Sequence, residues 1–543
     1  MPLFERRVHL PFRRTDVFTW FTRPGALVRL TPPFAGSVRR EPEGIHVGAE
    51  ARLGIGAPGS VGLGLESAAG LARTVLPVSL PAWLAPEVPW TARHTAFEDG
   101  RMFRDEMVSG PLRSWVHTHT FEDAAPGEAD TADGSPGTVM IDHVEYELPG
   151  SSLLSRFGQA GRFTGHWTRE HFEAELDRQF TYRHAQLRDD LSFHTDHGVA
   201  VGAGDTTVAP EAATPGDTAT RASSRSLTIV MSGARGLIGT QLAALLTGGG
   251  HRVVPLVRPG STTFGQRGAA IAWDPAAGSL DPEELRQADV VVNLSGENIG
   301  GRMTEAHRTA VLQSRLDTTG LLARTLAQLA DDGRPRTLVN GSGVGYYGSD
   351  AGAGPDGEGL PESGPAGTDF LAEVCQQWER ATAPAAEAGV RTVMIRTGLV
   401  QTPAGGILQQ VLPLFLVGAG GPLGTGGPFG GDGRDPWQSW ISIDDIVGLF
   451  AHAALSGSVT GPLNGVAPHP VRAREFAQTL GRVLHRPSAL PLPPQAPRMV
   501  LGEEGNRLLV EADQKARADK ALASGYRYRH PDLESALRHV LGR

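Results

Sequence analysis

A short apolar run followed at once by a glycine pattern restricts the possible fold of this 543-residue chain more than any other feature. Residues 226–231 read SLTIVM, which is typical of a buried strand, and the sequence continues SGARGLIGTQLAALLTGGG. Gly233, Gly236 and Gly239 give the spacing G-x-x-G-x-x-G. The first glycine permits a tight turn, the second lets backbone approach a pyrophosphate, and the third lets the next helix pack closely on the strand. The pattern predicts a strand–turn–helix unit with a dinucleotide at the helix N-terminus.

Strand-like and helical segments alternate after this unit. HRVVPLVRP is a second strand, and the alternation continues through AAIAWDP, ADVVVNLSG, RPRTLVNGSG and VRTVMIRTG. This order predicts the α/β class, with a doubly wound parallel sheet of the Rossmann type. The alternative to a dinucleotide site is that these glycines only form ordinary loop turns, since the chain has 70 glycines. The strand before the glycines and the helix after them favour the dinucleotide site.

Arg258 ends the second strand, where a site selective for NAD carries Asp or Glu against the ribose 2′-hydroxyl. An arginine suits a 2′-phosphate instead, and Arg235 in the glycine loop offers a second positive charge. NADP is therefore favoured over NAD, although arginine is also common at surfaces. The loop residues expected at the cofactor are Gly233, Arg235, Gly236, Leu237, Ile238 and Gly239.

Composition limits the partners and the compartment. The net charge is −9 and no basic run stands out, so we expect no nucleic-acid partner. Cys375 is the one cysteine, which excludes an intrachain disulfide and indicates a reducing compartment. The first residues lack the apolar core of a signal peptide, and no apolar run is long enough to span a membrane. We expect a cytoplasmic protein without membrane contact.

The stretch 196–225 is rich in Gly, Ala, Thr, Pro and Ser and is predicted to be a flexible linker. It separates residues 1–195 from a Rossmann-type domain at 226–485 and a small C-terminal α/β subdomain at 486–543. We expect residues 1–195 to fold alone, because the linker carries too few apolar residues to dock them and their hydrophobic partners lie within the segment.

Before the linker, alternating strands are followed by one long helix. Residues 4–11 alternate as a strand, and Thr15 is expected to cap a short helix over 15–21. Three further strand patterns are HTAFEDGRMFRDEM, RSWVHTHTFED and TVMIDHVEYELP, and residues 167–193 form an amphipathic helix. The order predicts an α+β domain with a curved sheet around that helix, the helix-grip arrangement. It resembles the START-like, or polyketide-cyclase-like, superfamily of ligand-binding domains.

Two hypotheses stay open for the interior of this domain. START-like folds usually enclose an apolar cavity, which would bind a hydrophobic ligand. In the alternative, aromatic side chains fill a solid core: Phe103, Trp115, Phe121 and Tyr146.

Four histidines also lie on the alternating runs: His94, His117, His119 and His143. A metal site built from them is one hypothesis. Isolated strand histidines are more often hydrogen-bonded structural residues, and we predict no metal.

Motifs along the second part of the chain point to a known family. They are SGARGLIG, NLSGENI, SRLDTTGLLA, GYYG, DFLAEVCQQWE, RTGLV, WISIDD and LNGVAPHP. With them, residues 226–543 resemble the atypical, epimerase-like branch of the extended short-chain dehydrogenase/reductase superfamily, related to NAD-dependent epimerases and dehydratases, which ends in a domain of unknown function. The resemblance implies NADP-dependent oxidoreductase or epimerase chemistry on a small molecule. It also implies cofactor contacts at Val257, Arg258, Leu294, Ser295, Arg315 and Val400.

The usual proton relay of that superfamily is missing from the sequence. Typical members carry a Tyr-x-x-x-Lys pair on the helix after the fifth strand. In DFLAEVCQQWE those places are held by Leu371 and Cys375, and no lysine precedes Lys515. Cys375 as a nucleophile is one reading, but a cysteine on the apolar stripe of a helix is more often inert core.

Three other residues are candidates for acid–base or hydrogen-bonding roles. Ser342 stands where the superfamily keeps a catalytic hydroxyl, Tyr346 follows it in GYYG, and Glu297 lies on the fourth-strand loop. A tyrosine without a cationic neighbour keeps a pKa near 10 and is a poor base at neutral pH.

Three functions therefore remain open. The first is an NADP-dependent oxidoreductase or epimerase with a non-standard acid–base group, acting on an unknown small molecule. The second is a non-catalytic NADP-binding regulator, and the third is a carrier of a hydrophobic ligand. The glycine-rich stretch 418–440 is interpreted as a mobile lid over the substrate or as a surface insert.

Overall fold

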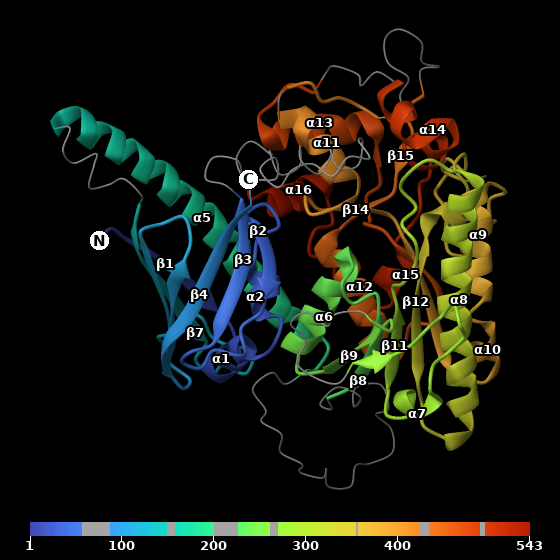
Figure 1. Ribbon diagram of the computed structural model, residues 1–543, viewed down its shortest axis with the longest axis horizontal. Coiled ribbons are helices and arrows are strands. Elements are labelled where there is room, and N and C mark those ends of the chain that lie inside the picture. The colour runs from blue at the N-terminus through green and yellow to red at the C-terminus, as the bar shows by residue number, and fades with distance from the viewer. Residues whose placement is uncertain are drawn as a thin grey trace.

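The computed structural model describes residues 1–56, 87–148, 158–199, 226–260, 270–354, 357–416, 418–423, 434–488 and 495–543. Most of the predicted linker and the middle of the predicted lid lie outside these residues. Two sheets stand side by side, an antiparallel sheet from the N-terminal part and a parallel sheet from the rest (Figure 1). None of the described helices combines the length and apolarity needed to cross a bilayer.

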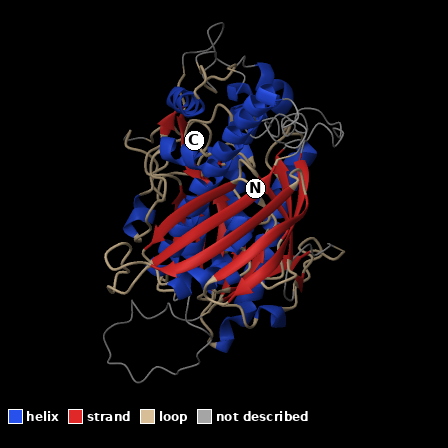
Figure 2. Cartoon of the chain, turned by 90° about the vertical axis from the view of Figure 1, so that its left-hand side faces the viewer, coloured by secondary structure: helices blue, strands red, loops and turns tan. Residues whose placement is uncertain are grey.

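The N-terminal part is a seven-stranded antiparallel sheet in the order β1-β7-β6-β5-β4-β3-β2, with α5 lying across one face. The opposite face is turned to the viewer in Figure 2. The elements are β1 (Leu3–Leu10), α1 (Arg14–Thr22), α2 (Ala26–Leu30), β2 (Gly36–Arg40), β3 (Glu50–Gly56), β4 (Glu87–Glu98), β5 (Met102–Ser109), β6 (Ser114–Asp123), β7 (Thr138–Glu147) and α5 (Gly158–Asp196).

Sequence periodicity accounts for most of this layer. The alternating runs are strands, and Gly100, at φ +68°, makes the turn between β4 and β5. One detail is wrong: Thr15 does not cap α1, because the helix begins at Arg14 and its N-cap residue is Arg13, without a side-chain cap. Phe103, Phe121 and Tyr146, three of the four aromatic residues expected to fill a solid core, are buried against other apolar side chains.

The second sheet has seven parallel strands in the order β10-β9-β8-β11-β12-β13-β17, as predicted for a Rossmann-type fold. The chain order reverses beside β8, so the crevice between β8 and β11 is the expected ligand position. The strands are β8 (Thr228–Ser232), β9 (Arg252–Val257), β10 (Ile271–Ala272), β11 (Val290–Asn293), β12 (Thr337–Gly343), β13 (Arg391–Thr397) and β17 (Gly461–Gly465). Smaller ladders use β14 (Leu399–Gln401), β15 (Trp437–Gln438), β16 (Trp440–Ser442) and β18 (Val471–Arg472).

Helices cover both faces of the parallel sheet, because alternate strand residues belong to different cores: Ile229 and Met231 pack on one side, Val230 on the other. The helices are α6 (Leu237–Gly248), α7 (Pro282–Leu285), α8 (Glu305–Leu329), α9 (Phe370–Arg380), α10 (Ala383–Glu387), α11 (Gly406–Leu416), α12 (Ile443–Leu455), α13 (Ala473–Leu484), α14 (Gln495–Leu509), α15 (Asp519–Ala523) and α16 (Leu533–Leu541), with 3₁₀ turns η3 (Ala330–Asp332) and η4 (Val344–Tyr347).

The two parts share a packed interface, so the expectation that the N-terminal part keeps its hydrophobic partners to itself is wrong. Phe193, near the end of α5, belongs to the apolar core of the parallel sheet. Gly25 lies so close to α6 that a Cβ atom there would sit 2.6 Å from the Cα of Ala244. Tyr182 on α5 stacks on His539 of α16 with ring centroids 4.5 Å apart. The N-terminal part packs on the parallel-sheet part through the surfaces of α2 and α5. The composition of the linker gives no information about these surfaces.

A buried ion cluster lies in the same interface. Arg29 on α2 donates two hydrogen bonds of 2.8 Å to Asp190 on α5 and one of 2.9 Å to Asp444 on α12. Arg529 adds a 2.8 Å bond to Asp190. Although burial opposes every charge, the carboxylates raise the pKa of Arg29, and Arg29 holds the pKa of Asp444 well below its usual range. All four groups therefore stay charged.

Removing the central cation should be costly. Arg29→Met leaves Asp190 and Asp444 buried with one charge partner fewer, and we expect the free energy of unfolding to fall by about 3–5 kcal/mol. Arg39→Met, which removes an exposed arginine paired with Glu87, should cost about 0–1 kcal/mol. Chemical denaturation followed by tryptophan fluorescence measures both. Equal losses in the two variants would contradict a special role for the cluster.

The interface should also weaken in acid. His194 at the end of α5 is 1% exposed, and burial lowers its pKa to about 3, whereas an unfolded histidine titrates near 6.5. A depressed folded pKa stabilises the fold above the unfolded value and loses that contribution as pH falls, here from about 6.5 towards 3. Melting temperatures should therefore drop less over this range in His194→Leu than in the unmodified protein. Equal slopes in His194→Leu and in the unmodified protein would refute the assignment.

Candidate functional site

The glycine turn after β8 has the close contacts predicted for it. Gly233 has φ +68°, and a Cβ there would lie 2.7 Å from the backbone of Leu294 on the neighbouring strand exit. A Cβ at Gly239 would lie 2.1 Å from the carbonyl oxygen of Gly233. Any larger residue at either position would push the helix away from the sheet.

The N-terminus of α6 is open to a ligand. Its N-cap residue is Gly236, and no side chain caps the first turn. The first backbone N–H groups of a helix have no partner inside it and carry partial positive charge, so they suit a pyrophosphate. Arg235 and Leu237 are exposed at the turn, Ile238 is half-buried, and Gly239 is buried behind them. The geometry of the turn fits a dinucleotide.

Side chains predicted around the rest of the cofactor lie at the same edge of the sheet. Val257 ends β9, which pairs in parallel with β8, and the exposed Arg258 follows it. Leu294 and Ser295 follow β11 directly, and both are half-buried. Val400 lies on β14 and packs against the core of the same half of the fold.

A buried polar network lies beneath this edge, and the sequence reasoning missed it. Ser232 donates to Asn293 at 2.6 Å, and Asn293 donates to Asn340 at 2.8 Å and to Thr319 at 2.9 Å. Trp378 of α9 also donates to Thr319, at 2.9 Å. The signal was one polar residue directly after the apolar residues of each of three strands. The network holds the ends of β8, β11 and β12 at fixed spacing and ties α8 and α9 to them.

Arg315 is the one buried charged residue among the predicted cofactor residues, with 9% of its surface exposed. Its guanidinium donates to the carbonyl of Glu297 at 3.0 Å and lies 4.8 Å from the ring centroid of Trp378. Burial lowers the pKa of Arg315 below that of a free arginine. Glu297 itself is exposed, and its backbone N–H donates to Ser314. Arg315 thus fixes the loop after β11, and the Glu297 carboxylate faces solvent.

Ser342 lies in a charged network on β12. Its hydroxyl donates to Glu379 at 2.8 Å, and Arg396 on β13 donates to both oxygens of that carboxylate, each at 2.8 Å. Ser342 and Arg396 are direct neighbours in the β12–β13 register. Arg396 also donates to the Tyr347 hydroxyl at 3.1 Å. The sequence singled out Ser342 but not Arg396, since an arginine inside a strand has no local signature.

The two tyrosines of GYYG have a cationic neighbour, which corrects the expectation that none is available. The Arg396 guanidinium lies 3.4 Å from the ring centroid of Tyr346 and 5.2 Å from that of Tyr347. Burial raises the pKa of Tyr347 to about 12, and its hydroxyl is held by Asn464 at 2.7 Å. Tyr347 is therefore a neutral structural residue, whereas Tyr346 is half-buried and closer to solvent.

The helix α9 matches the sequence prediction over Asp369–Glu379. Asp369 caps it by accepting a hydrogen bond from Ala372, and Leu371 and Cys375 are buried on its inner face. Burial raises the pKa of the Cys375 thiol to about 11. The cysteine is a protonated core residue and not a nucleophile.

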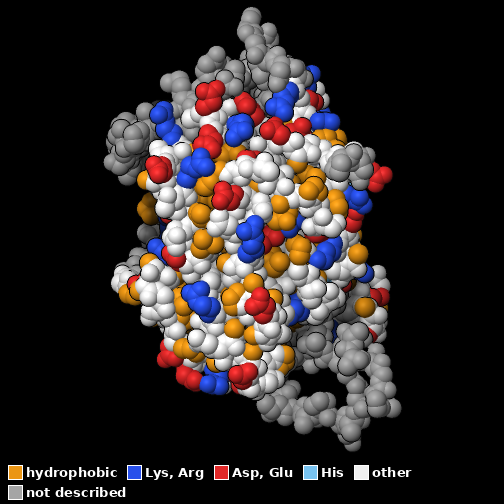
Figure 3. Space-filling view, turned by 90° about the vertical axis from the view of Figure 1, so that its right-hand side faces the viewer, with side chains coloured by type: hydrophobic (Ala, Val, Ile, Leu, Met, Phe, Trp, Pro, Cys, Tyr) orange, Lys and Arg blue, Asp and Glu red, His pale blue; other side chains and the backbone are white. Residues whose placement is uncertain are grey.

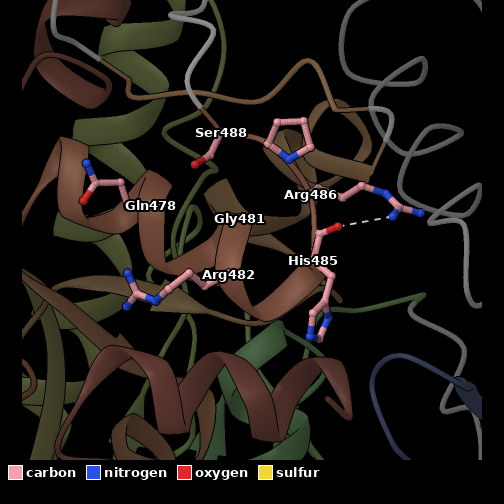
Figure 4. A pocket seen from close by; sticks show the side chains of 7 residues that line it. Gln478, Gly481, Arg482, His485, Arg486 and Ser488 are labelled. Carbon is pink, nitrogen blue, oxygen red and sulfur yellow. Dashed lines mark hydrogen bonds between the residues drawn. The ribbon is translucent and has the colours of Figure 1, made fainter.

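A surface pocket of about 600 Å³ lies elsewhere, at the end of α13 (Figure 4). Its lining is Gln478, Gly481, Arg482, His485, Arg486, Pro487 and Ser488. It contains none of the predicted site residues. Figure 3 shows the side of the molecule at α8, α9 and α10, where positive and negative side chains are interspersed.

Comparison with known proteins places the second part of the chain. The model of the NAD dependent epimerase/dehydratase family matches residues 229–462, and that of a domain of unknown function, DUF1731, matches 492–540. An epimerase family protein of Mycobacterium bovis is 36% identical over 58% of this chain and 98% of its own length. The human epimerase family protein SDR39U1 is 36% identical over 58% of this chain and 99% of its own length.

One solved structure resembles both parts together. It is titled a nucleoside-diphosphate sugar epimerase from Corynebacterium glutamicum, with 29% identity, a TM-score of 0.68, and coverage of 99% of this chain and 90% of that one. The antiparallel sheet and its placement beside the parallel sheet thus recur in a related protein. With its glycine turn, parallel sheet and C-terminal domain, the chain belongs to the NAD-dependent epimerase/dehydratase family.

Proposed function

We propose that the protein is an NADP-dependent oxidoreductase or epimerase-like enzyme that acts on a small molecule without a Tyr–Lys dyad. One observation carries this proposal: the uncapped helix N-terminus and the cluster of Ser342, Tyr346 and Arg396 lie at the carboxyl edge of one parallel sheet. That edge is where such folds bind ligands. A cofactor held along it would have its phosphates at α6 and its reactive ring towards β12.

Arg258 supports the choice of NADP. It is exposed at the end of β9, on the strand next to the glycine turn, where the adenosine ribose is expected. A guanidinium can donate two parallel hydrogen bonds to a phosphate. The bound nicotinamide would accept or donate hydride, and the protein would supply the proton transfer.

The proton transfer must use groups other than lysine. The Ser342 hydroxyl already donates a hydrogen bond to Glu379. Its oxygen can therefore accept a hydrogen bond from a substrate hydroxyl. Tyr346 is half-buried and has its ring on the Arg396 guanidinium, which holds the ring in place beside Ser342. These two side chains are the best candidates to orient the substrate and to exchange its proton.

A second candidate function, a non-catalytic NADP-binding regulator, is supported by the same network. Glu379 and Asn464 already engage the hydroxyls of Ser342 and Tyr347. The discriminating experiment uses NADPH deuterated at the transferable hydride, mixed with the protein and a cell extract. Deuterium that appears in a small molecule only with active protein supports an enzyme, and tight NADPH binding without transfer supports the regulator.

The N-terminal part supports a START-like assignment by its architecture, a curved antiparallel sheet with the long α5 on its inner face. The buried contacts of Phe103, Phe121 and Tyr146 favour the filled core over the cavity. A hydrophobic ligand for this part stays a prediction.

Cofactor selectivity can be tested at Arg258. Charge-assisted hydrogen bonds contribute about 1.5–3 kcal/mol each, so Arg258→Asp should weaken NADPH binding by about tenfold or more and leave NADH equal or better. Arg252→Asp is the matched control, because Arg252 is exposed at the opposite end of β9. Calorimetric titration with both cofactors measures the change. Equal affinity of the unmodified protein for NADH and NADPH would contradict the proposed selectivity for NADP.

The acid–base assignment can be tested with the deuterium-transfer assay. Ser342→Ala and Tyr346→Phe should each lower the transfer rate by about 10²-fold or more and leave NADPH affinity within about twofold, because neither contacts the phosphates. Glu297→Gln should transfer at the unmodified rate, since its carboxylate faces solvent. If Glu297→Gln alone abolishes transfer, the acid–base role belongs to Glu297.

A further inference from the structure

The inner face of the N-terminal sheet carries a group of imidazole and carboxylate side chains within its core. Asp142 on β7 is fully buried, and ring nitrogens of three histidines lie within 3.0 Å of its carboxylate: His117, His119 and His184. Strand register brings the group together, since Asp105 lies opposite His117 and His119 lies opposite Asp142. Burying polar groups costs free energy of folding unless each group has a partner. A buried group of this size therefore indicates a specific role.

Three side chains of this group place possible metal-ligand atoms close together. One ligand atom from each of Asp105, His117 and His119 lies within 4.8 Å of the other two. His117 Nδ1 is 3.5 Å from Asp105 Oδ2, which is longer than an ordinary N–H···O hydrogen bond. Two donors bound to one tetrahedral Zn²⁺ lie about 3.4 Å apart, so this separation suits a shared cation.

Asp142 is placed to orient the His117 imidazole. His117 Nε2 is 3.0 Å from Asp142, which turns Nδ1 of the same ring towards Asp105. Histidines that bind metals commonly donate their other ring N–H to a carboxylate, which fixes the tautomer. The His119 ring stacks on the Phe103 ring, with ring centroids 4.3 Å apart, and this contact holds the imidazole in place.

An unpartnered nitrogen gives an independent indication. His119 is 2% exposed, and among the described residues its Nδ1 has no hydrogen-bond partner, although Asp142 is 2.7 Å away in a poor orientation. A buried ring nitrogen without a partner is uncommon in a folded protein. A small rotation of the ring towards a cation would satisfy it.

We propose that Asp105, His117 and His119 bind a divalent transition-metal cation, with Asp142 orienting the His117 imidazole. Two imidazole nitrogens and one carboxylate oxygen form a three-ligand set that Zn²⁺ accepts, leaving a fourth position for water or a small ligand. The sequence alone predicts no metal, because each strand histidine is then considered by itself. Register and the inward face of β6 bring two of them together, whereas His143 pairs with Glu5 elsewhere.

The test uses the full-length protein, purified without a polyhistidine tag, stripped with a chelator and titrated with Zn²⁺ by calorimetry. We expect one Zn²⁺ per chain and, with Co²⁺, visible absorption bands of a low-symmetry N/O site. The double variant His117→Gln/His119→Gln should bind Zn²⁺ more than tenfold more weakly. Asp142→Asn should weaken binding by about 10–100-fold, because it removes only the orienting carboxylate.

Two controls make the result specific. His143→Gln lies on the same sheet outside the group and should bind Zn²⁺ as the unmodified protein does. His530→Gln/His539→Gln tests another group of three, Asp444, His530 and His539, which also gathers potential ligand atoms.

Circular dichroism and NADPH affinity show whether each variant is folded. If the His117/His119 double variant does not fold, Asp105→Asn gives the same readout, because that carboxylate is partly exposed and its loss leaves the core filled. The proposal is overturned if the unmodified protein binds no Zn²⁺, if the folded ligand variants bind it as tightly, or if only the His530/His539 variant loses it.

Discussion

The charge pairing of Arg29 with Asp190 and Asp444 is the constraint on which the arrangement of the two parts depends. Its members come from α2, α5 and α12, so the cluster forms only when both sheets are in place. Buried ion pairs often add little net stability compared with apolar packing, but a misplaced partner leaves a buried charge uncompensated. The cluster therefore acts mainly on specificity: it penalises every other docking of the antiparallel sheet.

The same helix, α12, connects this interface to the C-terminal part. Next to Asp444, the carboxylate of Asp445 accepts hydrogen bonds from the backbone of Arg529 and His530 and from the hydroxyl of Tyr526. Neighbouring carboxylates on one buried helix thus contact both the N-terminal part and the chain end, and Asp444 itself lies 3.5 Å from His539 of α16. The end of the chain lies beside the N-terminal part, next to α16 (Figure 1), and a Cβ atom at Gly542 would sit 2.4 Å from the Phe34 ring.

Local patterns predicted the parts of the structure that local residues determine. Alternation gave the strands, and the glycine spacing gave the turn at Gly233, because steric contact with the adjacent strand exit leaves no room for a side chain. Arg396 and Asp444 could not be found in this way. Each is a single charged residue in an apolar segment, and its partner lies on another element far along the chain. The Asp-Asp pair in WISIDD was the available signal, since two carboxylates inside an apolar helix require buried partners.

The choice of arginine over lysine limits what the candidate active site can do. An ammonium group beside a tyrosine can hold a ribose hydroxyl and exchange a proton. The Arg396 guanidinium stays charged at any physiological pH, and its planar shape lets it hold the Glu379 carboxylate at its edge and face the Tyr346 ring at the same time. Arg396 is therefore a fixed positive charge and not a proton carrier. Any proton exchanged at this edge would have to move through Ser342, Tyr346 or solvent.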